Sequence, residues 1–204
     1  MEIAILPVGP LQANCYILSD GGKNAVVIDP GGEAPRILAE IRKRELRIQY
    51  ILLTHVHFDH MMAATEVREA TGAPLLVPKE DADALADPRR SLVGMLPVAG
   101  TVPTPDRLLT EGERIGEGEL TLTVLATPGH TPGSVCYRGD GILLTGDTLF
   151  AGSVGRTDFP GGDGTALRRS LRRLSNLEGE YTVLPGHGPE TSLETERRTN
   201  PYMR

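Results

Sequence analysis

Apolar residues in the N-terminal quarter of the chain fall into short runs separated by turn-forming residues. Within residues 1–30, the runs EIAILPV, NCYILSD and NAVVIDPGG predict strands, and the GG and PGG sequences between and after them are typical of turns. Over residues 33–47, apolar residues recur at roughly helical spacing with charged residues between them, which predicts an amphipathic helix. The following run, IQYILLT, predicts a buried strand.

The rest of the chain alternates irregularly between strand-like and helix-like segments. MMAATEVREATG predicts a helix that ends at Gly72, APLLVP a strand and KEDADALAD a short helix. Residues 88–108 contain four prolines and no clear period, so we expect a surface loop that partly covers a site. The later runs LTLTVLATPGH, SVCYRGD, GILLTGD and YTVLPGH predict strands, whereas GTALRRSLRRLSNL and ETSLETERR predict helices.

This order of elements limits the fold class. Hairpin-like strand runs occur beside strand–helix units, which excludes a purely parallel Rossmann pattern and predicts layered sheets with helices outside them. No linker or low-complexity segment divides the sequence, and 204 residues suffice for one well-buried core. We therefore expect a single domain over residues 1–204.

Composition indicates the class of protein and its cellular location. Apolar residues make up 39% and charged residues 24%, which is typical of soluble globular proteins. No apolar run approaches the ~20 residues that cross a membrane, and the acidic residue at position 2 and an early proline argue against a secretory signal. We expect a cytoplasmic protein with no membrane partner. The net charge of −6 gives no support for a nucleic-acid partner.

Two other residue types allow simple expectations. Cys15 and Cys136 lie in separate apolar strand-like runs, which predicts buried free thiols rather than a disulfide framework. Two arginine pairs, at 168–169 and 172–173, lie four residues apart on one predicted helix. A solvated helix face is the simpler interpretation, and a surface for an anionic partner is the alternative.

The five histidines of the chain all follow predicted strands. Three of them lie in THVHFDH, residues 54–60, directly after IQYILLT. His130 follows LTVLATPG, His187 follows TVLPG, and Asp147 follows ILLTG. Strand ends and their loops are where rigid scaffolds present functional groups. A single histidine is usually a structural residue, but that explanation would have to hold five times at the same kind of position.

Metal binding accounts for this pattern. Imidazole and carboxylate are suitable ligands for zinc, iron and manganese. Alternate residues of an extended segment point the same way, so His55 and His57 can hold one ion, and Asp59 and His60 can face a second. The remaining candidates complete the two positions: His130 the first, His187 the second, and Asp147 as a bridge. Seven ligands leave open coordination positions on two divalent ions, which is typical of a catalytic site, with zinc favoured and iron or manganese as alternatives.

The motifs THVHFDH, TPGHT, TGDTLF and LPGHG, in this order, resemble the metallo-β-lactamase superfamily and within it the glyoxalase II-like branch. The resemblance runs from NCYIL and DPGG to the C-terminal LPGHGPET segment. It implies a four-layer αβ/βα sandwich, with two mixed β-sheets face to face, helices on both outer faces and metals at one edge. It implies the same division of metal ligands: His55, His57 and His130; Asp59, His60 and His187; and Asp147 as the bridge.

The resemblance also implies hydrolysis by a hydroxide held between two ions, with a thioester as the favoured substrate. A thiolate, with a pKa of about 8.5, needs little help in leaving, whereas an amide nitrogen needs a proton donor and the sequence offers no obvious one. Asp59 is the candidate that orients the hydroxide and moves its proton. The substrate would be an S-acylglutathione or a smaller thioester.

Two departures from glyoxalase II concern substrate binding. Those enzymes carry a C-terminal helical domain that holds glutathione, and we expect a form without it, because the sequence ends soon after LPGHG. In GSVGRTDF, Arg156 stands where the family has a basic residue for the glutathione carboxylate, but Asp158 replaces the aromatic residue that the family has two positions further on. Arg156 is therefore a candidate for binding an anionic substrate group, and an ion pair with Asp158 that braces the loop is the alternative.

Three other functions compete with this interpretation. GRTDF also resembles persulfide dioxygenases of the same fold, which imply one iron held by His55, His130 and Asp147. A nuclease of the same superfamily is less favoured because the chain is acidic. A non-catalytic metal-binding protein is the last alternative, and the complete ligand set argues against it.

Overall fold

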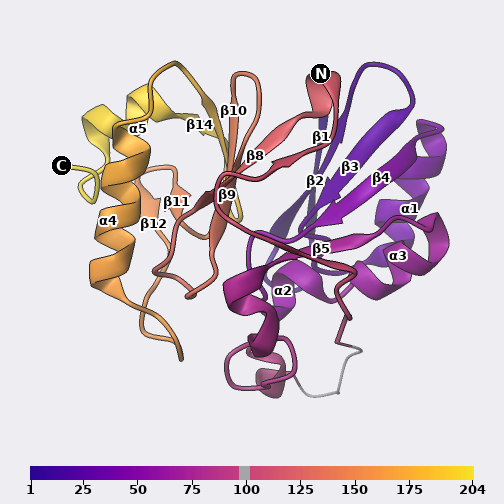
Figure 1. Cartoon of the computed structure of the whole chain (residues 1–204), viewed down its shortest axis with the longest axis horizontal. Helices are drawn as coiled ribbons and strands as arrows, with labels where there is room; N and C mark the ends of the chain where they lie inside the picture. The colour runs from indigo at the N-terminus through magenta and orange to yellow at the C-terminus, as the bar shows by residue number, and fades with distance from the viewer. Residues whose placement is uncertain (97–101) are drawn as a thin grey trace.

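Two six-stranded β-sheets lie face to face, and each is built from one continuous part of the chain (Figure 1). The computed structural model describes residues 1–96 and 102–204. Strands of the first sheet come from the N-terminal half, up to Leu109, and strands of the second sheet begin at Arg114.

The first sheet is mixed. Its strand order is β1 (Glu2–Val8), β2 (Ala13–Ser19), β3 (Asn24–Ile28), β4 (Arg47–Leu52), β5 (Leu75–Pro78) and β6 (Arg107–Leu109). The first three strands pair antiparallel, and β3 to β6 pair parallel. The parallel strands β4 and β5 therefore end at the same edge of the sheet.

The second sheet is also mixed. Its order is β14 (Thr191–Ser192), β13 (Thr182–Pro185), β10 (Ile142–Gly146), β9 (Val135–Arg138), β8 (Leu122–Ala126) and β7 (Arg114–Ile115). Only β10 and β13 pair parallel among these strands. A separate hairpin of β11 (Leu149–Phe150) and β12 (Ser153–Val154) follows β10.

Helices cover the outer faces of both sheets (Figure 1). Helices α1 (Ala34–Lys43) and α3 (Ala64–Thr71) lie on the first sheet, and α4 (Gly164–Ser175) and α5 (Leu193–Thr199) on the second. The short helix α2 (Phe58–Met61) follows β4, and 3-10 turns form at η1 (Lys79–Ala84), η2 (Val93–Met95) and η3 (Gly118–Leu120). Among the described residues, no helix is both long and apolar enough to span a bilayer.

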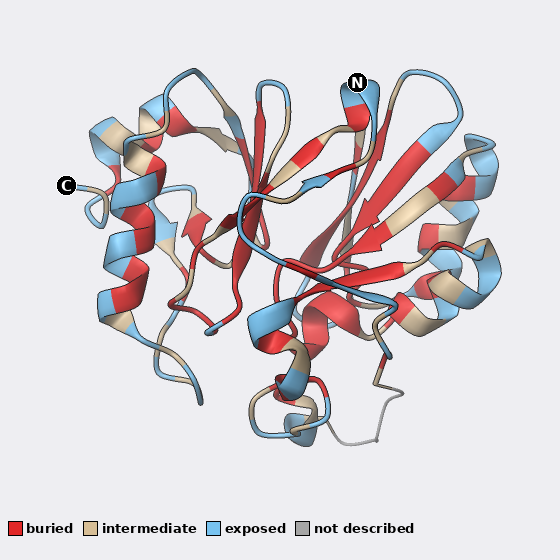
Figure 2. Cartoon of the chain, in the orientation of Figure 1, coloured by how far each residue is buried: buried red, intermediate tan, exposed pale blue. Residues whose placement is uncertain are grey.

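Three apolar layers hold this sandwich together. Figure 2 shows that the strands of both sheets are largely buried, whereas the helices have exposed outer faces. The middle layer joins the inner faces of the sheets, and the outer layers join each sheet to its helices. Strand β2 illustrates the cause, because alternate side chains of a strand point to opposite faces. Tyr16 and Leu18 enter the middle layer, whereas Cys15 and Ile17 pack under α1 and α3.

The structure confirms the expected fold class and modifies several element boundaries. The helix expected over residues 33–47 ends at Lys43, and the helix expected from MMAATEVREATG begins only at Ala64, because the preceding residues form α2 and a turn. KEDADALAD forms a 3-10 turn rather than an α-helix. Both cysteines are free and buried, and the four arginines of α4 are exposed, as expected.

The segment 88–108 is more regular than its sequence indicates. It contains the turn η2 and ends in β6, which lies at the edge of the first sheet. Residues 97–101 of this segment lie outside the described residues. On the described side, Leu92 and Met95 line a cavity, so this part of the segment does border a site.

Candidate metal centre

Four strand ends from the two sheets bring the predicted ligands to one edge of the sandwich. His55 follows β4, His130 follows β8, Asp147 directly follows β10, and His187 follows β13. Each strand is buried in the core and ends in a turn. The polar side chains of that turn therefore lie at the edge where the two sheets meet. The seven predicted ligand residues fall into three overlapping groups with ligand atoms within 4.8 Å.

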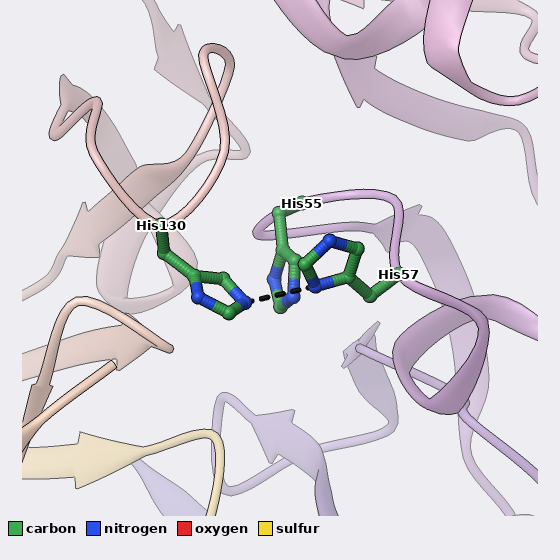
Figure 3. A group of neighbouring side chains, drawn as sticks. All are labelled: His55, His57 and His130. Atoms are coloured by element: carbon green, nitrogen blue, oxygen red, sulfur yellow. Dashed lines mark hydrogen bonds between the residues drawn. The ribbon is translucent and has the colours of Figure 1, made fainter. Parts of the chain in front are cut away.

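The first group consists of His55, His57 and His130, all of which are buried. Figure 3 shows the three imidazole rings turned toward one another, two from the loop after β4 and one from the second half of the chain. The Nε2 atom of His130 lies 2.8 Å from Nδ1 of His57, and the His55 ring centroid lies 4.8 Å from each of the other two. Three imidazoles are thus gathered around one point.

The second group consists of Asp59, His60 and His187. Asp59 and His60 lie on α2, which turns the chain away from the extended segment carrying His55 and His57. The Oδ2 atom of Asp59 lies 3.2 Å from Nε2 of His187, and the Nε2 atoms of His60 and His187 lie 3.4 Å apart.

Asp147 lies between these two groups. Its Oδ1 atom is 3.4 Å from Nε2 of His60, and its Oδ2 atom is 3.4 Å from Nε2 of His130 and 3.7 Å from Nε2 of His187. The carboxylate therefore faces histidines of both groups, as a bridging ligand must.

Unpaired buried atoms show that this donor set fits divalent cations. Within the described part of the chain, His55 Nε2, His57 Nε2 and Asp147 Oδ1 are buried without a hydrogen-bond partner. Leaving such groups unpaired costs about 1–3 kcal/mol each, and native proteins rarely do so. Coordination removes this cost, and nitrogen and carboxylate donors suit zinc, iron and manganese.

Burial and neighbouring charges move the pKa values of the cluster in opposite directions. Burial, reinforced by neighbouring histidines, lowers the pKa of His55 well below its usual value and that of His57 to about 3. Burial also disfavours a charged His60, but Asp59, Asp147 and Asp29 outweigh it and raise the pKa of His60 well above its usual value.

The two carboxylates stay ionised for the complementary reason. Burial favours the neutral acid, yet His60 and its neighbours lower the pKa of both Asp59 and Asp147. For His187, burial is outweighed mainly by the hydrogen bond to Asp59, so its pKa is raised. Asp59, Asp147, His55 and His57 are therefore in the protonation states that metal ligands require, whereas His60 and His187 would release a proton when they bind a metal ion.

Asp29 forms hydrogen bonds behind the cluster and was not predicted as a site residue from the sequence. It lies directly after β3, is 1% exposed, and accepts hydrogen bonds from Thr54 N at 2.7 Å and Thr54 Oγ1 at 2.6 Å. Its Oδ2 atom also lies 3.0 Å from Nδ1 of His60, which leaves Nε2 of that ring free to face the site. A carboxylate behind a metal-binding histidine fixes the ring orientation. The sequence feature that could have identified Asp29 is its position directly after a strand, because the predicted ligands also follow strands.

Two glycines permit the close packing of the site. A Cβ atom on Gly186 would lie 2.2 Å from Oδ1 of Asp147, and one on Gly31 would lie 1.5 Å from the carbonyl oxygen of Asp59. Any side chain at these positions would displace a predicted ligand segment. The glycines of DPGG and LPGHG therefore serve close approach as well as turn formation.

A cavity of about 590 Å³ opens above the cluster. Five of the predicted ligand residues contribute to its lining, and its other described walls are apolar except for one arginine: Leu11, Phe58, Leu92, Met95, Phe150, Val154, Arg156 and Phe159. These apolar residues could not be predicted from the sequence, because isolated large hydrophobic residues in loops carry no pattern.

Arg156 lies at the cavity wall in an ion pair. Its Nε and Nη2 atoms each donate to a carboxylate oxygen of Asp158 at 2.6 Å, and its guanidinium carbon lies 4.1 Å from the centre of the Phe159 ring. The expected ion pair with Asp158 is therefore present. The side chain is nevertheless 59% exposed, so it remains accessible to a molecule in the cavity.

The fold and the site define a scaffold that gathers candidate metal ligands at one edge of two stacked sheets, and comparison with known sequences identifies its family. The sequence profile described as the metallo-beta-lactamase superfamily matches residues 8–187. The chain belongs to this superfamily.

Characterised and uncharacterised relatives match the chain along nearly its whole length. The probable metallo-hydrolase YqgX of Bacillus subtilis is 40% identical, over 97% of this chain and 95% of its own. The hydroxyacylglutathione hydrolase GloC of Haemophilus influenzae is 37% identical, over 100% of this chain and 98% of its own.

Similar solved structures share this fold, and their descriptions differ in activity and in bound metal. BLEG-1, described as a B3 metallo-beta-lactamase, has a TM-score of 0.92 and 37% identity over 99% of both chains. TTHA1623, solved in a di-iron-bound form, has a TM-score of 0.87 and 39% identity over 98% of this chain and 99% of its own. ETHE1 from Myxococcus xanthus has a TM-score of 0.79 and 31% identity over 98% of this chain and 84% of its own.

Proposed function

We propose that the protein is a thioester hydrolase whose centre holds two divalent metal ions, zinc being favoured over iron or manganese. The observation that carries this proposal is the convergence of seven residues with nitrogen or carboxylate donors, some of them buried and unpaired, beside a cavity of about 590 Å³ that five of them line. Bound divalent ions supply Lewis acidity and a strongly acidified water as the nucleophile.

The chain's own residues have separate tasks in this proposal. His55, His57 and His130 would hold one ion, Asp59, His60 and His187 would hold the other, and Asp147 would contribute its carboxylate between them. Asp59 lines the cavity and its pKa is lowered, so its carboxylate is ionised at neutral pH and could accept a proton from a water bound there.

The leaving group favours a thioester. Outside the predicted ligands, Arg156 is the titratable residue among the described cavity walls, and an arginine stays protonated and cannot act as a proton donor at neutral pH. A thiolate leaves without such a donor, whereas an amide nitrogen does not. The relative GloC, described as a hydroxyacylglutathione hydrolase, supports the same substrate class.

Persulfide oxidation is the second candidate, because the GRTDF segment resembles persulfide dioxygenases of this fold. That reaction would use a single iron held by His55, His130 and Asp147. The separate group of Asp59, His60 and His187, with ligand atoms within 4.8 Å, favours a second ion and therefore the hydrolase. A non-catalytic metal-binding role has no support from the open cavity above the cluster.

Metal analysis combined with a substrate panel tests the proposal. Protein purified without added metal should contain about two ions per chain and hydrolyse S-D-lactoylglutathione or the acetyl thioester of N-acetylcysteamine. Oxygen consumption with glutathione persulfide and opening of the β-lactam nitrocefin should be slower. One iron per chain with rapid oxygen consumption would instead establish the dioxygenase.

His57→Ala is the matching variant. It removes one of three imidazoles from the first group, and thioesterase activity should fall at least about 100-fold while circular dichroism stays unchanged. Full activity in this variant would contradict the proposed centre.

A further inference from the structure

A buried carboxylate lies beside both loops that carry the three-histidine group and is hydrogen-bonded to one of them. Asp81 lies in the turn η1, directly after β5, and is 0% exposed. It lies in neither of the loops that carry the predicted ligands. Burying an ionisable side chain is costly unless hydrogen bonds compensate it, so the partners of Asp81 indicate what it does.

Both oxygens of Asp81 bind the loop of His130. The hydroxyl of Thr131 donates to Oδ2 at 2.7 Å, and the backbone N–H of Gly133 donates to Oδ1 at 2.7 Å. The backbone N–H of Val56, between His55 and His57, also faces this carboxylate and favours its ionised form. One side chain therefore lies between a loop of the first sheet and a loop of the second.

Asp81 packs directly against the backbone of Gly133, which leaves no space for a side chain between them. A Cβ atom on Gly133 would lie 2.6 Å from Cγ of Asp81 and 2.4 Å from its backbone nitrogen. The loop of His130 thus contacts η1 with no intervening side chain. Any change in the position of Asp81 would shift this loop relative to His57, whose Nδ1 atom lies only 2.8 Å from His130 Nε2.

We propose that Asp81 is a positioning residue that sets the distance between the His55–His57 loop and the His130 loop, and thereby determines metal affinity at the three-histidine position. The inference rests on the metal centre of the proposed function, but not on the identity of the substrate. The group of Asp59, His60 and His187 should depend less on Asp81, because its histidine His60 is oriented by Asp29.

Zinc affinity, measured by competition with a chromophoric chelator, tests this role directly. Asp81→Ala should bind one ion with roughly wild-type affinity and the other about 10- to 100-fold more weakly, the usual effect of removing a group that orients metal ligands. Asp81→Asn keeps one acceptor oxygen and should give an intermediate affinity.

Glu196 supplies a matched control. It is 2% exposed, and its carboxylate likewise accepts hydrogen bonds from a backbone N–H, that of Gly152, and from a threonine hydroxyl, that of Thr191. Glu196→Ala should lower the melting temperature of the metal-free protein as Asp81→Ala does, yet leave both zinc affinities unchanged. Equal losses of affinity in the two variants would reduce Asp81 to a general stabilising residue and overturn the inference.

Thr131 provides a milder variant in case Asp81→Ala does not fold. Thr131→Val removes the hydroxyl donor at almost constant volume and should weaken one zinc site about threefold to tenfold, whereas Thr131→Ser should retain wild-type affinity. Unchanged affinity in Thr131→Val and Asp81→Asn would refute the inference. A wild-type protein that binds two ions but hydrolyses no thioester would refute only the proposed substrate.

Discussion

The charge of individual side chains in the site is set by burial and by neighbouring charged groups. His60 is fully buried, which disfavours its charged form, but three carboxylates surround it and favour that form. At the cavity wall, Arg156 is more than half exposed and paired with Asp158, so its charge is balanced but accessible. His60 would therefore have to release its proton when it binds a metal ion, whereas the accessible charge of Arg156 is suited to distinguishing substrates by charge.

Arg156→Ala tests that distinction. The variant should lower kcat/KM for S-D-lactoylglutathione about twofold to fivefold, because an exposed ion pair is worth at most about 1 kcal/mol. The rate with the neutral acetyl thioester of N-acetylcysteamine should change less than twofold. Asp158→Asn keeps the guanidinium and should not reduce either rate. Equal losses with both substrates in Arg156→Ala would show that the residue only braces its loop.

At the scale of elements, helix α4 is fixed to the second sheet by more than its apolar face. Arg173 Nη1 donates to the carbonyl oxygen of Ala126 at 2.9 Å and to Glu111 Oε2 at 2.9 Å. Glu111 Oε2 also accepts from Ala126 N at 2.6 Å, so one carboxylate connects the helix with the end of β8. His130 lies four residues after this end.

Arg173→Ala should therefore destabilise the protein slightly and in a pH-dependent way. The hydrogen bond from Arg173 lowers the pKa of Glu111, so its contribution is present above the unfolded-state pKa of about 4.3 and is lost as pH falls through the lower folded-state value. Urea unfolding at pH 7 should show a loss of about 0.5–1 kcal/mol, since the pair is partly exposed. The difference should shrink below about pH 4. Arg172→Ala, an exposed change on the same helix, should stay within about 0.5 kcal/mol at both pH values.

Elements with a sustained pattern could be predicted from the sequence, and short ones could not. The apolar spacing of α4 and the runs of β2 and β4 gave the right structures. Strands of two residues, such as β7 and β14, contain too few side chains to show alternation, and they form because neighbouring strands offer hydrogen bonds. The spacing of the histidines gave the ligand clusters, but the roles of Asp29 and Asp81 depend on contacts between distant segments.

At the scale of the whole molecule, every candidate metal group takes members from both halves of the chain. The first group combines His55 and His57 with His130, and the second combines Asp59 and His60 with His187. These residues lie after strands of different sheets. Cations bound here would add contacts between two sheets that otherwise meet through their middle apolar layer.

Removal of metal should therefore lower the thermal stability. A ligand present at 100 times its dissociation constant stabilises the folded state by about 2.7 kcal/mol, which corresponds to a melting temperature shift of about 5–10 °C for a chain of this size. Exhaustive chelation should lower the melting temperature by this amount, and added zinc should restore it. His57→Ala should show a smaller shift. An unchanged melting temperature in protein proven free of metal would contradict this expectation.

The contiguity of each sheet has one more consequence. The strands of the two sheets are joined through a single short stretch after Leu109, where residues 110–112 are exposed. A backbone break there would leave two fragments, each with its own sheet and an incomplete set of donors. Zinc bound between them would then raise the affinity of one fragment for the other, so the assembly of a split protein would depend on the metal concentration.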